Sequence, residues 1–119
     1  MRKLRVAALQ LRSGIEPAAN RAHALPLIRE AAAAGARLIA TPENTYRLDR
    51  NRERAVAAAS PEKGDGELAA WARIAQEHGV WLLLGSAAIA TGRGKVFNRS
   101  FLYTPEGKVA ARYDKINLF

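Results

Sequence analysis

Three short apolar runs along the chain predict strands buried in a sheet. They are residues 4–11 (LRVAALQL), residues 37–41 (RLIAT) and residues 80–86 (VWLLLGS). The first is apolar enough for a central strand, and the third is apolar without interruption, which is typical of a strand covered on both faces. Because helical patterns separate these runs, the chain is expected to alternate strands with helices.

A helix is predicted between the first two strands, where apolar residues recur at helical spacing. The residues on this apolar face are Leu25, Ile28 and Ala32. Pro17 suits the first turn of a helix, and Gly35 is a natural residue just beyond the last turn. Pro26 conflicts with this pattern, because a proline inside a helix removes one hydrogen bond and bends the axis. Either the helix is kinked at Pro26 or it begins near that residue.

A second helix is predicted over residues 67–79 (ELAAWARIAQEHG). Its apolar face consists of Leu68, Trp71, Ala72 and Ala75. Gly79 is expected to end this helix. The polar stretch at residues 42–54 is expected to be a long connection between the second strand and this helix.

The last third of the chain predicts a β-hairpin. Residues 96–104 (VFNRSFLYT) and 108–119 (KVAARYDKINLF) are joined by Pro105-Glu106-Gly107, which suits a tight turn. An antiparallel hairpin added to strands that alternate with helices gives an α/β fold class with a mixed sheet. The period-two alternation at the end of the chain predicts a strand that enters a core at Phe119.

The net charge of +8 raises the question of nucleic-acid binding. The basic residues are spread along the chain, and the densest cluster, residues 47–54, is interrupted by Asp49 and Glu53 and contains no aromatic residue. A solvated arginine-rich surface is therefore favoured over nucleic-acid binding, which stays as an alternative. Neither a membrane-spanning apolar run nor a signal-peptide pattern is present, so a cytoplasmic protein without a membrane partner is expected.

The chain contains no cysteine, which excludes disulfides, thiolate metal ligands and a cysteine nucleophile within these 119 residues. His23 and His78 are far apart in sequence, and each falls in a helical pattern. Both are expected to be surface or capping residues rather than metal ligands. A metal site built on cysteine or histidine is therefore not expected.

Two charged residues could carry chemistry. Glu43 follows the second predicted strand directly, and the carboxyl ends of strands are where α/β proteins build their sites, although Pro-Glu-Asn is also ordinary turn sequence. Lys115 shares a predicted strand face with Tyr113, Asn117 and Phe119, which suggests partial burial, although a strand lysine is often a half-exposed surface residue. If the two converge in one pocket, they could act as a base and an oxyanion stabiliser.

The order and spacing of several segments resemble the nitrilase superfamily of carbon-nitrogen hydrolases. These segments are VAALQL, the run that leads into Glu43, VWLLLGS, GKVFNRSFLYTPEGKV and RYDKINLF. The two sharpest motifs are strand-Pro-Glu at Glu43 and Tyr-x-Lys-x-x-Leu-Phe at Lys115. The resemblance covers residues 5–119, and it is nearest to the amidase branch that acts on small ω-amides and deaminated glutathione.

The resemblance implies a Glu-Lys-Cys triad on a four-layer α-β-β-α sandwich, with Glu43 as general base and Lys115 as oxyanion stabiliser. Residues 1–119 would form the N-terminal part of a single domain, truncated before the nucleophile cysteine, so the chain as given is predicted to be inactive. The substrate would be a small amide, less readily a nitrile. The resemblance implies no metal or organic cofactor, because the chemistry of the family uses side chains and water alone. The full-length enzyme would form a homo-oligomer.

Three further positions carry weaker expectations. Asn117 stands where many members of the family have histidine, and Asn98 matches an asparagine common in the family, expected here to bond nearby backbone. The glycines around Gly85 are expected to reflect the geometry of a strand end rather than a phosphate cradle. An alternative to catalysis is a non-catalytic binding or structural module that pairs with another copy or a complementary chain.

Overall fold

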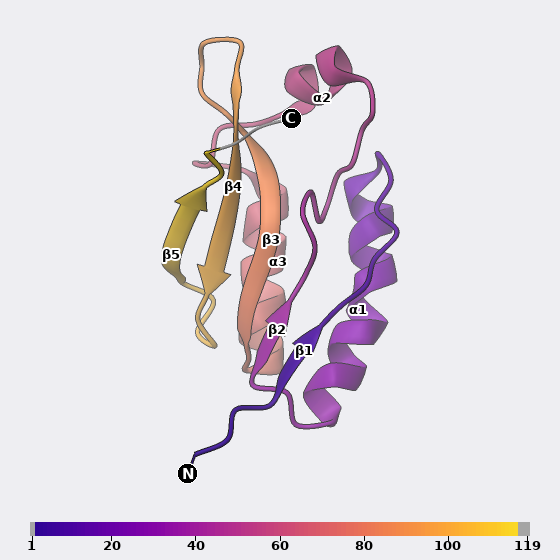
Figure 1. Ribbon diagram of the computed structural model, residues 1–119, viewed down its shortest axis with the longest axis vertical. Coiled ribbons are helices and arrows are strands. Elements are labelled where there is room, and N and C mark those ends of the chain that lie inside the picture. Colours follow the sequence, from indigo (N-terminus) through magenta and orange to yellow (C-terminus); the bar gives the residue numbers. More distant parts are fainter. Residues whose placement is uncertain (1, 117–119) are drawn as a thin grey trace.

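The computed structural model describes residues 2–116. Its main body is a five-stranded mixed sheet with two helices on one of its faces (Figure 1). Strands and helices alternate over the first part of the chain, as the sequence predicts. The expectations for Asn117 and Phe119 lie outside the described residues.

The five strands lie in the order β1-β2-β3-β4-β5. Their bounds are Val6–Ala8, Leu38–Ala40, Trp81–Ala90, Val96–Tyr103 and Val109–Asp114. The first three strands are parallel, and β4 and β5 add to them as an antiparallel hairpin. The α/β class and the mixed sheet are therefore confirmed.

The prediction of a central first strand is wrong. β1 pairs only with β2 and forms the edge of the sheet within the described chain. Only Val6–Ala8 belong to the strand, and Val6 is 59% exposed. The reason is that an apolar composition does not fix a strand's place in a sheet, which depends on pairings between distant segments.

Helix α1 (Pro17–Ala33) runs through Pro26 without interruption, so the alternative that it begins near that proline is wrong. Its residues Ala24 and Ile28 are completely buried. This packing outweighs the loss of one backbone hydrogen bond at an exposed position of the helix. Gly35 follows the helix with φ +91°, the left-handed conformation expected of a residue just past a helix end.

Helix α3 (Gly66–His78) confirms the second predicted helix. Asp65 caps its start by accepting hydrogen bonds from the Glu67 and Leu68 amides, and Gly79, at φ +60°, ends it. A short helix, α2 (Arg52–Ala58), lies where the sequence predicts only a polar connection. The sequence feature that could have predicted α2 is Asn51, a residue type that often caps the start of a helix. Its side chain accepts a hydrogen bond from the Arg54 amide at 2.9 Å.

Strand β3 is longer than predicted, because it continues to Ala90 instead of ending at residue 86. Its pairing with β4 shifts between Leu84 and Ala87, which marks a β-bulge. The sequence suggested that Gly85 lies at a strand end. The residue lies instead inside a bulged strand. β5 ends at Asp114, so Lys115 follows the strand directly instead of lying within it.

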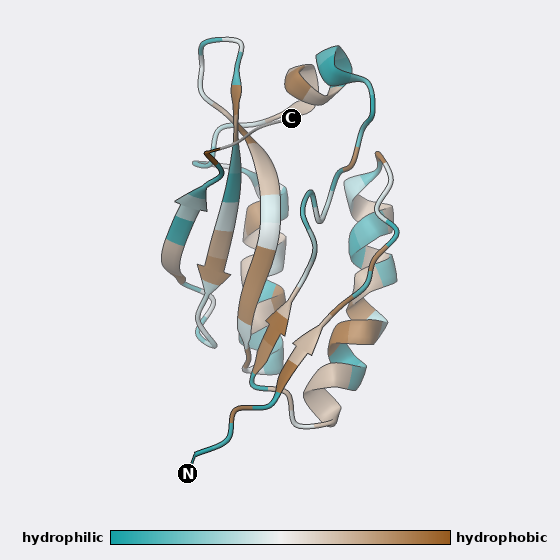
Figure 2. Cartoon of the chain, in the orientation of Figure 1, coloured by the Kyte–Doolittle hydropathy of each residue, from teal (hydrophilic) through white to brown (hydrophobic). Residues whose placement is uncertain are grey.

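The core lies between the sheet and its helices. Trp71 of α3 is completely buried, and the rings of Phe101 and Tyr103 on β4 stack with centroids 6.1 Å apart. Figure 2 shows apolar residues along the strands of the sheet, and within residues 2–116 no helix covers the face opposite α1 and α3. Its large exposed side chains include Val6, Trp81, Leu83 and Tyr113.

Candidate active site

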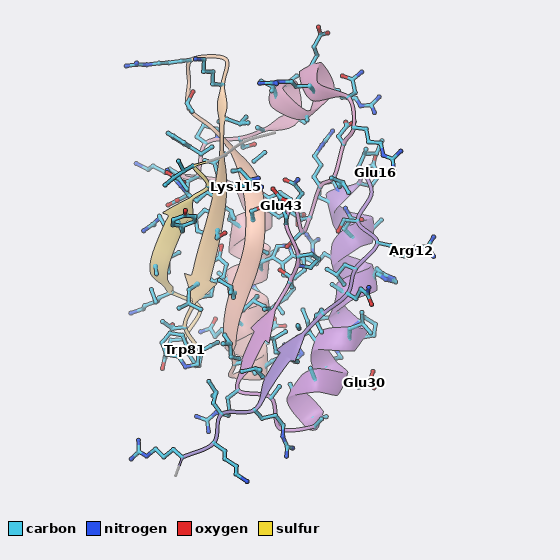
Figure 3. All side chains as sticks on the ribbon, viewed as in Figure 1. Arg12, Glu16, Glu30, Glu43, Trp81 and Lys115 are labelled. Atoms are coloured by element: carbon cyan, nitrogen blue, oxygen red, sulfur yellow. The ribbon has the colours of Figure 1, made fainter. Side chains whose placement is uncertain are left out.

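Glu43 and Lys115 meet at the carboxyl ends of β2 and β5. The Lys115 Nζ atom donates a hydrogen bond to Glu43 Oε1 at 3.1 Å, across 72 positions of sequence. Figure 3 shows the two side chains at the same end of the sheet. The Lys115 side chain is 32% exposed and that of Glu43 is 51% exposed. The lysine thus has the partial burial and the carboxylate partner that its sequence suggested.

The turn that carries Glu43 is held on both sides by backbone hydrogen bonds to β3. The Thr41 amide donates to the Leu83 carbonyl at 3.0 Å, and the Thr45 amide donates to the Ser86 carbonyl at 3.0 Å. Asn44, the residue after Glu43, has φ +54°, a conformation that non-glycine residues rarely adopt. Its amide donates to Ser86 Oγ at 2.9 Å, which holds this conformation in place.

Gly85 allows this turn to lie directly against β3. A Cβ atom at this position would lie 2.2 Å from the Thr41 carbonyl oxygen and 2.3 Å from that of Pro42. The Gly85 amide donates to Thr41 Oγ1 at 3.1 Å. The glycine therefore serves a close approach of two backbones, and its amide is occupied by a protein hydroxyl rather than directed at a phosphate.

Lys115 is positioned through the end of the β4–β5 hairpin. Its amide donates to the Asn98 carbonyl at 2.9 Å, which continues the pairing of the two strands by one residue. The Arg99 guanidinium also donates hydrogen bonds to both carboxylate oxygens of Asp114, from Nε to Oδ1 at 2.6 Å and from Nη2 to Oδ2 at 2.9 Å. A bidentate pair of this kind fixes orientation as well as distance, so the last residue of β5 and the lysine that follows it are held firmly.

Asn98 belongs to the site, which the sequence reading missed. Its side chain was expected to bond nearby backbone, but Nδ2 donates instead to Glu43 Oε1 at 2.5 Å. No clear sequence signal points to this contact, because it depends on the register of the hairpin, which brings residue 98 opposite Lys115.

The hydrogen bonds at Glu43 determine its ionisation. Donation by Lys115, and after it by Asn98, lowers the pKa of the Glu43 carboxyl despite a smaller opposing effect of burial. A carboxylate takes a proton from a thiol most readily where geometry and the exclusion of water narrow the gap between their pKa values. The Glu43 side chain is 51% exposed in the described chain, and its two donors favour the ionised form.

A second charged cluster lies beside the site. Glu62 accepts hydrogen bonds from Arg112 at 2.7 to 3.0 Å and from Arg99 at 3.3 Å. Hydrogen bonding to Arg112, reinforced by Arg99, lowers the pKa of Glu62, and Arg99 likewise lowers the pKa of Asp114. The cluster ties the loop before α3 to β4 and β5.

The remaining candidate residues do not join the site. His23 is exposed on α1, and His78 Nδ1 lies 2.8 Å from the Ile74 carbonyl oxygen at the end of α3. Within residues 2–116, no group of three or more His, Cys, Asp or Glu side chains is arranged to hold a metal ion. Nor does any helix in that range have the length and apolarity to cross a membrane.

Comparison with known proteins decides the family. The sequence model of a family described as carbon-nitrogen hydrolase matches residues 5–119. The chain belongs to the carbon-nitrogen hydrolase family. This confirms the resemblance to the nitrilase superfamily of carbon-nitrogen hydrolases.

Curated relatives of this carbon-nitrogen hydrolase chain include two amidases. A deaminated glutathione amidase of Yersinia enterocolitica is 32% identical over 126 residues, an alignment that covers 100% of the chain and 42% of the relative. An omega-amidase of Homo sapiens is 32% identical over 123 residues with the same coverage. The chain therefore spans less than half the length of the relatives it matches, and its nearness to the amidase branch is confirmed.

Solved structures give the same fold. An amidase from Nesterenkonia sp. superposes with a TM-score of 0.85 at 24% identity, over 98% of this chain and 44% of that one. A variant of the Nesterenkonia sp. AN1 amidase in complex with butyramide gives a TM-score of 0.85 at 25% identity, with the same coverage. The carbon-nitrogen hydrolase chain thus has the fold of part of a nitrilase-superfamily amidase.

Proposed function

We propose that this chain supplies the general base and the oxyanion stabiliser of an enzyme that hydrolyses small carboxamides. The observation that carries the proposal is the 3.1 Å contact between Lys115 Nζ and Glu43 Oε1 at the carboxyl ends of two strands. A carboxylate and an ammonium placed together can serve acyl transfer to a thiol as general base and oxyanion stabiliser. Membership of the carbon-nitrogen hydrolase family supports the same reaction class.

In the proposed reaction, Glu43 takes the proton of a cysteine thiol, and the thiolate sulfur bonds to the amide carbon. Lys115 stabilises the negative charge that develops on the substrate oxygen. The carbon-nitrogen bond then breaks as the proton passes from Glu43 to the leaving nitrogen, and ammonia departs. Water attacks the resulting thioester, which yields a carboxylic acid and regenerates the thiol.

The nucleophile is the part that this chain does not provide. Its 119 residues contain no cysteine, so the chain by itself is predicted not to turn over an amide. We propose that residues 1–119 act as the N-terminal part of one catalytic domain, with the thiol contributed by further sequence. The assembly is proposed to be a homo-oligomer.

The substrate is proposed to be a small carboxamide of the ω-amide or deaminated glutathione type. The names of the two curated relatives support this class, and the butyramide held by the Nesterenkonia amidase variant is also a small carboxamide. Nitriles are the less favoured substrates.

The test uses the protein expressed from the complete natural reading frame that encodes this chain. Ammonia release is measured with butyramide, ω-amides, deaminated glutathione and a matching set of nitriles. Release from one of the amides, abolished by Glu43→Gln, supports the proposal. A folded product that releases ammonia from none of these compounds would refute it.

A second candidate function rests on the uncovered face of the sheet. Trp81 and Leu83 expose 37% each of their surface there, and Tyr113 exposes 59%. Exposed apolar area of this kind favours association, so the chain could act as a non-catalytic module that pairs with a second copy. Analytical ultracentrifugation of the 119-residue chain tests this, because a monomer at all concentrations would contradict it.

A further inference from the structure

Asn98 contacts both charged residues of the site, each through a different group. Its backbone carbonyl accepts from the Lys115 amide at 2.9 Å, and its side-chain Nδ2 donates to Glu43 Oε1 at 2.5 Å. The residue lies in β4, between the two segments that it joins. Asn98 is therefore placed to control how the carboxylate and the ammonium face each other.

Both side-chain donors reach the same oxygen of Glu43. Lys115 Nζ and Asn98 Nδ2 each bond Oε1, and within residues 2–116 no hydrogen bond is formed to Oε2. Two donors on one oxygen fix the rotation of a carboxyl group. The second oxygen is then the one left to accept a proton from an incoming group.

The orientation of the Asn98 amide follows from its surroundings. Its Oδ1 atom is buried and accepts no hydrogen bond from any group in residues 2–116. Turning the amide over would place Oδ1 against the carboxylate at hydrogen-bond distance, where two acceptors repel each other. Among the described residues the side chain thus leaves one buried acceptor without a donor, at a cost in stability, while it donates to Glu43. An interaction that holds Glu43 explains this arrangement better than a contribution to folding does.

We propose that Asn98 is a positioning residue that, together with Lys115, turns Glu43 so that Oε2 takes the proton of the nucleophile. The role of Asn98 in proton transfer rests on the proposed function, whereas its hydrogen bond to the Glu43 carboxylate does not. The groups that face Glu43 in the described chain are Lys115 and Asn98, and the neighbouring charges of Arg99 and Asp114 are paired with each other.

The first experiment follows the titration of the Glu43 carboxyl by carbon-13 NMR in the 119-residue chain, with the resonance assigned from Glu43→Gln. Asn98→Leu removes the donor at nearly constant volume and is expected to raise the titration midpoint. Asn98→Asp places a second carboxyl against Glu43 and is expected to raise the midpoint further. This order is specific to a donor that acts on Glu43.

Asn51→Leu is the matched control, because it removes the same amide group from the exposed cap of α2 without contact to Glu43. It is expected to lower Tm and leave the Glu43 midpoint unchanged. Asn98→Leu is expected to shift the Glu43 midpoint whatever its effect on Tm. A wild-type midpoint in Asn98→Leu would overturn the proposal. If Asn98→Leu does not fold, Asn98→Ala takes its place, with the same expected shift of the Glu43 midpoint.

The second experiment measures turnover of the protein from the natural reading frame. Asn98→Leu is expected to reduce kcat by about 10- to 100-fold with little change in KM, because the base is misplaced while the substrate pocket is intact. The acid limb of its pH-rate profile should move to higher pH together with the NMR midpoint. An unchanged kcat in Asn98→Leu would overturn the proposal that Asn98 positions Glu43 for proton transfer. If the wild-type protein is inactive while Asn98→Leu shifts the Glu43 midpoint, the proposed function is refuted and the effect of Asn98 on Glu43 is still established.

Discussion

Gly85 and Pro42 approach each other so closely that no side chain fits between them. A Cβ atom on Gly85 would lie 2.3 Å from the Pro42 carbonyl oxygen. That oxygen belongs to the turn that carries Glu43, so it cannot move aside without displacing the carboxylate. The bulge in β3 and the turn after β2 therefore form one structural unit.

Gly85→Ala is expected to lower the free energy of unfolding by about 1–3 kcal/mol, because the added methyl group must push the turn away from β3. Urea unfolding measures this loss. Gly66→Ala is the matched control, since a Cβ at Gly66 meets nothing within 4 Å. The control should leave stability unchanged or raise it by about 0.4–1 kcal/mol. Equal losses in both variants would contradict the close-approach explanation.

The sequence was sufficient to select Glu43 and Lys115 as candidates, because each stands in a short motif, Glu43 directly after a predicted strand and Lys115 within one. It was not sufficient to find Asn98, because the contact depends on the exact register of the hairpin. Continuing the Tyr103–Val109 pairing without irregularity would set Lys115 opposite Phe97. The shift between Leu102 and Tyr103 moves the lysine by one residue to Asn98, and such a shift leaves no clear trace in composition.

The same limit explains the other differences between prediction and structure. The apolar run at residues 4–11 indicates a strand, but its place at the sheet edge follows from the strand order β1-β2-β3. Gly85 reads as a strand end until its pairing with β4 reveals a bulge. Local patterns therefore predicted which elements form, while long-range pairing determined how they meet at the site.

Glu43→Gln and Lys115→Ala are each expected to reduce kcat of the protein from the natural reading frame by about 1000-fold or more, because they remove the base and the oxyanion stabiliser. Both side chains are partly exposed, so the fold should be retained. The measurement combines steady-state kinetics with circular dichroism. Glu106→Gln and Lys108→Ala, at the exposed hairpin turn, serve as charge-matched controls. Near-normal turnover in either site variant would remove the role assigned to that residue.

Pro26→Ala is expected to raise the free energy of unfolding by about 1–3 kcal/mol, because Pro26 lies inside α1 and alanine restores a helical hydrogen bond. Pro17→Ala is the control. Pro17 is the first residue of the same helix, where a proline lacks no intrahelical hydrogen bond, so its replacement should change stability by less than about 1 kcal/mol. Thermal unfolding measures the change in stability of both variants. A gain in stability no larger for Pro26→Ala than for Pro17→Ala would show that α1 is not a regular helix around Pro26.

Acid is expected to weaken the attachment of the hairpin through Glu62 and Asp114. Hydrogen bonds from arginines lower the pKa of both carboxyls in the folded chain, from ordinary values of 4.5 and 3.8. Because the unfolded chain binds protons more readily, this stabilisation is complete above about pH 4.5 and is lost as the pH falls through the lowered folded values. The urea midpoint should therefore decrease steeply below about pH 4.5.

Glu62→Gln isolates the contribution of the cluster to this acid sensitivity. The variant should be less stable than the wild type by about 1 kcal/mol at neutral pH, because the two arginine contacts lose their charged partner. The difference should shrink as the pH falls, since the wild-type carboxyl becomes protonated as well. Urea unfolding at a series of pH values measures it, with Glu106→Gln as the control at an exposed turn position. A difference between Glu62→Gln and wild type that stayed constant down to about pH 3 would mean that ionisation of Glu62 does not stabilise the folded chain.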